Sequence, residues 1–64
     1  MTISENIIKK FEDILEREKI ALKLYTQIIS QIHDEFIIAR LGQIKQDEIK
    51  HIQIAQEMLK LLKQ

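Results

Sequence analysis

Two seams of regularly spaced apolar residues, one in each half of the chain, constrain the fold most. In the first half, alternating steps of four and three residues connect Ile7, Phe11, Ile14, Glu18, Ala21, Tyr25, Ile28 and Ile32. In the second half, the same steps connect Ile37, Leu41, Ile44, Glu48, His51, Ala55, Met58 and Leu62. This spacing is typical of helices that pack in a bundle or a coiled coil. Each half of the chain therefore predicts one long amphipathic helix.

A short connection between the two seams predicts an antiparallel helical hairpin. We expect a first helix over about 4–31 and a second over about 35–63, with Asp34 as the N-cap of the second. Thr2 and Glu5 form a capping-box pattern before the first helix, and Ser4 is a competing N-cap. The chain has no Pro and one Gly, which agrees with an all-α fold. One long bent helix is the alternative.

The small size of the chain predicts a single domain, residues 1–64, that needs support beyond its own core. Because the sequence contains no Cys, disulfides and thiolate-bound metals are excluded. A metal or oligomerisation remains as the support. Ten acidic residues balance ten basic ones, so nothing favours binding to nucleic acid or to an anionic membrane. The sequence has neither a signal-peptide pattern nor a long apolar run, and we expect a cytoplasmic protein.

Three polar residues interrupt the seams: Glu18 in the first, and Glu48 and His51 in the second. Glu18 and Glu48 each lie fifteen residues from His33 in the connection, or about 22 Å along a helix at about 1.5 Å per residue. In an antiparallel hairpin the two carboxylates are therefore level, and His51 lies one turn further on the same face as Glu48. An ionised Glu in an apolar seam is costly unless another group pairs with it.

A homodimer or higher homo-oligomer would bury the apolar faces and would complete the polar layer. Two hairpins related by a two-fold axis form a four-helix bundle whose layer holds four Glu and two His. Four close carboxylates need cations to remain ionised, and two divalent metal ions would neutralise them. Carboxylate and imidazole ligands suit iron or manganese, and zinc also binds such a set. The alternative is a metal-free polar layer that specifies helix register.

The residues Glu18-x6-Tyr25 and Glu48-x-x-His51 resemble those of the ferritin-like superfamily. The resemblance covers nearly the whole of this chain, but this chain corresponds to only half of the usual four-helix ferritin-like unit. It is closest to half-size members such as the encapsulated ferritins, to one helix pair of rubrerythrin and to the designed "due ferri" hairpins. It implies a di-iron site with Glu18 and His51 as terminal ligands and Glu48 as a bridge. It also implies oxidation of Fe(II) by dioxygen or peroxide. Residues 1–64 show no counterpart of the further C-terminal helix and cargo-targeting extension of the encapsulated ferritins, so we do not expect encapsulation or their larger ring assembly.

Other residues near the pattern have two interpretations each. The Tyr25 hydroxyl either bonds a ligand carboxylate, as the resemblance implies, or fills the core. Asp47 either supports a ligand His or is solvated, and His33 is expected on the surface. Without Cys there is no rubredoxin-like donor domain, which favours iron oxidation over a complete peroxidase. A peroxide reductase with an external donor and a non-catalytic helical scaffold stabilised by metal remain the alternatives.

Overall fold

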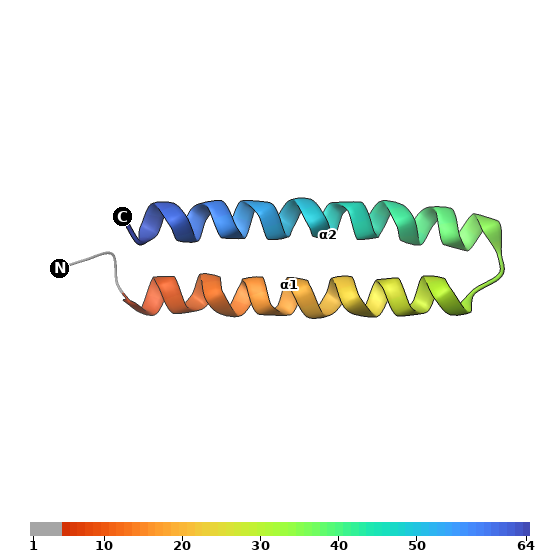
Figure 1. Ribbon diagram of the computed structural model, residues 1–64, viewed down its shortest axis with the longest axis horizontal. Helices are drawn as coiled ribbons and strands as arrows, with labels where there is room; N and C mark the ends of the chain where they lie inside the picture. Colours follow the sequence, from red (N-terminus) through yellow and green to blue (C-terminus); the bar gives the residue numbers. More distant parts are fainter. Residues whose placement is uncertain (1–4) are drawn as a thin grey trace.

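The chain forms a hairpin of two long helices in the computed structural model, which describes residues 5–64. Helix α1 spans Glu5–Gln31 and α2 spans Glu35–Leu62. The two helices lie side by side and run in opposite directions, joined at one end by residues 32–34 (Figure 1). The all-α hairpin is therefore confirmed and the single bent helix is excluded. The first helix ends and the second begins where expected, and α2 ends one residue before the expected 63, whereas the expected start at residue 4 lies outside the described residues. The capping pattern at Thr2 and Ser4 lies outside the described residues.

The N-cap of α2 is Asp34, as the sequence predicts. Its side-chain Oδ1 accepts hydrogen bonds from the backbone N–H groups of Phe36, at 2.9 Å, and Ile37, at 3.0 Å. These two donors have no partner within the helix, so the aspartate satisfies them where the chain reverses direction. This cap fixes where α2 begins and so sets which of its residues are level with Glu18.

The contact between the helices uses one row of residues from each, which we call the inner rows. In and just after α1 the row consists of Ile8, Phe11, Leu15, Glu18, Leu22, Tyr25, Ile29 and Ile32, all half-buried. In α2 it consists of Ile38, Leu41, Lys45, Glu48, Ile52, Ala55, Leu59 and Leu62, all half-buried or buried. Half of each predicted seam therefore faces the other helix of the hairpin. The other half does not, because two helices in contact cover only a narrow strip of a wide apolar stripe.

The remaining seam residues form a second surface, which we call the outer face. It consists of Ile7, Ile14, Ala21 and Ile28 on α1 and Ile37, Ile44, His51 and Met58 on α2. Each outer-face residue lies three positions after, or four positions before, an inner-row residue of the same helix. Because the two helices run in opposite directions, this offset turns the outer-face residues of α1 and α2 to the same side of the hairpin. Ile14 and Ile37 are both 45% exposed, although their neighbours in sequence pack between the helices.

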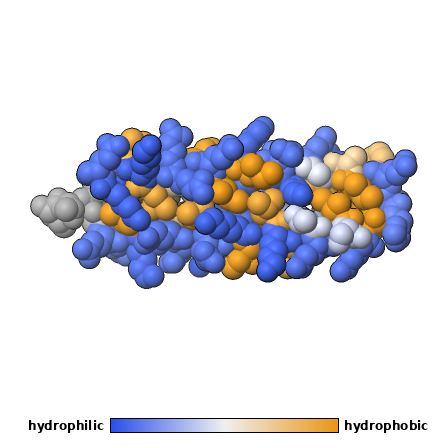
Figure 2. Space-filling view, in the orientation of Figure 1, coloured by the Kyte–Doolittle hydropathy of each residue, from blue (hydrophilic) through white to orange (hydrophobic). Residues whose placement is uncertain are grey.

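The core of the isolated hairpin is thin. Among the described residues, Ala55 and Leu59 alone are buried, at 4% and 8% exposed. In the space-filling view, hydrophobic residues reach the surface along the line between the helices, bordered by hydrophilic ones (Figure 2). In the described part of the chain, neither helix has an apolar stretch of the length that crossing a bilayer requires. The hairpin thus leaves most of its apolar side chains partly in contact with solvent.

Gly42 lies within α2, where its backbone freedom destabilises the helix. A Cβ atom added there would meet no atom within 4 Å, so close approach of α1 does not require a glycine. We therefore expect Gly42→Ala to raise the free energy of unfolding by about 1 kcal/mol, because alanine is the better helix former. Urea unfolding of the two proteins at equal concentration measures the difference. A loss of stability would instead show that another molecule contacts Gly42 from outside the hairpin.

Candidate metal centre

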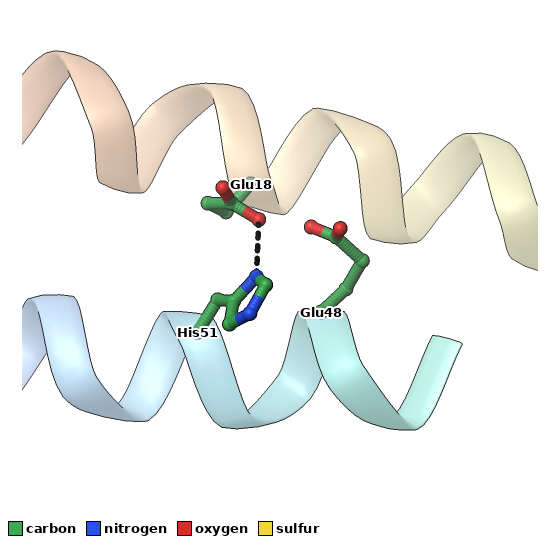
Figure 3. A group of neighbouring side chains, drawn as sticks. All are labelled: Glu18, Glu48 and His51. Carbon is green, nitrogen blue, oxygen red and sulfur yellow. Dashed lines mark ion pairs between the residues drawn. The ribbon is translucent and has the colours of Figure 1, made fainter. Parts of the chain in front are cut away.

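Three polar side chains meet at the mid-length of the hairpin: Glu18 from α1, and Glu48 and His51 from α2 (Figure 3). One ligand atom of each lies within 4.8 Å of the ligand atoms of the other two. The inner rows place the two carboxylates opposite each other, and one helical turn separates Glu48 from His51. The three residues that the spacing predicts to share a layer therefore do so. The described residues contain no other group of three such side chains.

The imidazole of His51 lies at the edge of the layer, on the outer face. Its Nδ1 is 3.6 Å from Oε2 of Glu18, a distance that suits an ion pair when the imidazole is protonated (Figure 3). The side chain of His51 is 56% exposed and that of Glu18 is 24% exposed. The carboxylates are thus held between the helices, while the imidazole is open to a molecule that approaches the outer face.

Two carboxylate oxygens in the layer have no hydrogen-bond partner. They are Oε2 of Glu18 and Oε2 of Glu48, and both are shielded from solvent. A carboxylate oxygen in that position loses its hydration without gaining a hydrogen bond, although the imidazole of His51 lies 3.6 Å from Oε2 of Glu18. Unsatisfied carboxylate oxygens that face each other are what a bound cation would neutralise.

The pKa of Glu48 is raised from its ordinary value of 4.5. The largest cause is that its protonated carboxyl group can share a hydrogen bond with Glu18; partial burial and the negative charge of Glu18 add to it, and His51 opposes it. When both groups are ionised, no proton is available for that hydrogen bond, and neither Oε2 atom has a hydrogen-bond partner. The layer therefore favours added positive charge, which either a proton or a metal ion can supply.

The residues present fit a divalent metal ion. Two carboxylates and one imidazole form a ligand set that iron, manganese or zinc accepts, and the absence of thiolates makes the set a hard one. One hairpin offers three side-chain ligands, which leaves part of the coordination shell of an ion open. The open side is the outer face, where the exposed His51 lies.

The structure does not bring the other candidate residues into this group. Tyr25 lies on the inner row two turns from Glu18, and within residues 5–64 its hydroxyl makes no hydrogen bond. Asp47 is exposed and acts on the layer through its charge, which contributes to the raised pKa of Glu48. His33 is exposed in the connection, as expected. A role for Tyr25 in the chemistry of the site stays a prediction.

Comparison with protein-family models, with curated proteins and with solved structures finds no match for this chain. The functional interpretation therefore rests on the geometry and the chemistry of the layer formed by Glu18, Glu48 and His51.

Proposed function

We propose that two copies of this chain form a ferritin-like four-helix bundle that binds two iron ions between them and oxidises Fe(II) with dioxygen or peroxide. The observation that carries this proposal is the group of Glu18, Glu48 and His51. It combines three metal-type ligands with two shielded, unpartnered carboxylate oxygens. Most of the other residues between the helices are apolar, and in such a contact a group of this kind is costly unless an opposite charge pairs with it.

The thin core and the outer face support the pairing of two copies. A chain of 64 residues whose described part, residues 5–64, has two buried side chains is marginal by itself. The outer face carries large apolar side chains above and below the layer, and Ile14 and Ile44 are 45% and 39% exposed. A second hairpin on this face would cover them and would add its own Glu and His to the same layer.

The charges in the layer account for the number of metal ions. A dimer brings together four carboxylates, and two divalent cations would balance their four negative charges. Glu18 and Glu48 would supply oxygen ligands, and His51 would supply a nitrogen ligand from the outer face. The resemblance to the ferritin-like superfamily implies that Glu48 would bridge the two ions. In this proposal the hydroxyl of Tyr25, on the same row two turns away, donates a hydrogen bond to a ligand carboxylate.

Two Fe(II) ions supply the two electrons that the oxidant takes up. Reduction of one dioxygen to hydrogen peroxide, or of one hydrogen peroxide to two waters, takes two electrons and two protons. In this proposal Fe(II) is the substrate that gives up one electron per ion. The residues of the layer would hold the two ions near each other.

An anaerobic titration with Fe(II), followed by addition of air, tests the proposal. We expect uptake to saturate at about two irons per dimer, and air to convert the bound iron to Fe(III), seen as near-ultraviolet absorbance. We expect Glu48→Ala to lose both signals, because the layer then lacks two of its four carboxylates. Absence of stoichiometric uptake in the unaltered protein would sink the proposal.

A matched control separates the layer from general effects of charge. Glu57 lies on the same helix as Glu48 and is exposed. Glu57→Ala should bind and oxidise iron like the unaltered protein. Repeating the titration with Mn(II) and Zn(II), and with hydrogen peroxide in place of air, identifies the preferred metal and oxidant. Metal binding without oxidation would favour a scaffold stabilised by metal, and turnover of peroxide with an added reductant would favour a peroxide reductase.

A further inference from the structure

Two exposed charges border the outer face beside the polar layer, one on each helix. Arg17 lies three residues after Ile14 of the outer face on α1. Asp47 lies three residues after Ile44 of the outer face on α2. Residues three apart share one side of a helix, so both charges lie on the side of the outer face. Within residues 5–64 neither side chain forms an ion pair or a hydrogen bond, and each can therefore pair with a second molecule.

The surface around Arg17 has the shape that receives another helix. An open depression on α1 is lined by Lys10, Asp13, Ile14 and Arg17. Four residues at such spacing, i, i+3, i+4 and i+7, form the hole into which one side chain of a facing helix fits. Because Ile14 belongs to the outer face, the facing helix has to come from a second hairpin.

Two hairpins can pack face to face about a two-fold axis in two ways, which differ in the helices that face each other. If the axis runs along the helices, α1 of each copy faces α2 of the other, and both connections lie at one end. If the axis crosses the helices at the polar layer, α1 faces α1 and α2 faces α2. The polar layers meet in both arrangements. An exposed apolar side chain six residues from the layer, Ile54 in the first and Leu24 in the second, also lies level with the depression in both.

The charges beside the layer distinguish the two arrangements. Arg17 directly precedes Glu18, and Asp47 directly precedes Glu48. Since the two carboxylates are level, the facing charges differ in height by about 3 Å in either arrangement, at about 1.5 Å per residue. With α1 against α1, each Arg17 faces a second Arg17 and each Asp47 a second Asp47. With α1 against α2, each Arg17 faces Asp47 of the other copy, and this complementarity favours the second of these contacts.

From this complementarity we propose that α1 of each copy packs against α2 of the other, with Arg17 of each copy paired with Asp47 of the other. The inference rests on the proposed dimer and adds which helices face each other, and that both connections lie at the same end. The occupant of the outer face is a second copy because that copy carries the opposite charge at the height of each unpaired one.

Cross-linking between single cysteines tests which helices face each other. The chain has no Cys, so Arg17→Cys and Asp47→Cys each introduce one thiol beside the layer. A short bismaleimide added to an equal mixture of the two zinc-loaded proteins should join one chain of each kind, identified by mass. It should join neither variant to itself. Self-linking of either variant, or a dimer that the reagent does not link in the mixture, would overturn the pairing and leave the metal site standing.

Charge reversal provides an independent measurement. Arg17→Asp should raise the Kd of the zinc-loaded dimer about tenfold or more, because two attractive pairs become repulsive. The double variant with Asp47→Arg should restore the Kd. Lys19→Asp is the control, since Lys19 is exposed two residues before Ala21, on the far side of α1, and sedimentation should find its Kd nearly unchanged.

An equal loss in the control, or no recovery in the double variant, would overturn the pairing. A single-chain mass for the unaltered protein with and without zinc would overturn the dimer itself, and with it the proposed function.

Discussion

Replacing Glu18 and Glu48 together by leucine is expected to raise the free energy of unfolding of the metal-free protein by about 1 to 4 kcal/mol, the range found when buried ionic groups give way to apolar ones. The reason is that both side chains lie on the inner rows, each with an unpartnered oxygen. Leucine removes that cost and adds apolar contact between α1 and α2. The same double substitution should abolish Fe(II) uptake, because it leaves His51 as the single ligand of the group in each chain.

Urea unfolding in the presence of a chelator measures the gain, and anaerobic Fe(II) titration measures the loss. Glu16→Leu with Glu57→Leu is the control, because both residues are exposed and lie outside the layer. The control adds the same two leucines and should neither stabilise the protein to the same extent nor reduce iron binding. If the Glu18 and Glu48 variant were less stable than the unaltered protein without metal, the carboxylates would be structural, and the layer would be a device that sets helix register.

Metal ions are expected to raise the melting temperature of the protein and to bring its chains together. A ligand that binds only the folded dimer stabilises it by about 2.7 kcal/mol per site when its free concentration is a hundredfold above Kd. For a protein of this size we expect the midpoint to rise by about 10 °C or more. Thermal melts with Zn(II) in air, or with Fe(II) under argon, measure the rise, and sedimentation at the same concentrations measures the mass.

Glu48→Gln is the matched variant for this experiment, since the amide keeps the shape of the side chain and removes its charge. Its midpoint should be nearly insensitive to metal, and a chelator should return the unaltered protein to its metal-free midpoint. An equal rise in both proteins would show that the ions bind elsewhere on the chain. A rise without any change in mass would show that a single hairpin holds the metal and that the outer face has another use.

The sequence predicts the hairpin and the position of its polar layer because both follow from local rules. Helical spacing determines which residues share a stripe, and Asp34 determines where α2 begins. Equal distances from the connection then bring Glu18 level with Glu48. The structure shows which residues of each wide apolar stripe pack between the two helices. For example, Ile8 faces α2, whereas Ile7 is turned outward. Spacing cannot decide between these neighbours, because both belong to the same stripe and the choice depends on the packing of the two helices.

The chemistry of the layer could be predicted in part. The residue types identify potential metal ligands, and the spacing puts them at one height. The unpartnered oxygens of Glu18 and Glu48 and the exposure of His51 appear only in three dimensions, because they depend on which side chains the two helices cover. The choice between iron, manganese and zinc is not encoded in the three ligands, since all of these ions accept carboxylate and imidazole.

Helix α1 begins and α2 ends at the same end of the hairpin (Figure 1). A label or a partner domain fused after α2 would therefore lie beside the start of α1, a full helix length of about 40 Å from the connection. Such a fusion leaves the connection end of the hairpin free.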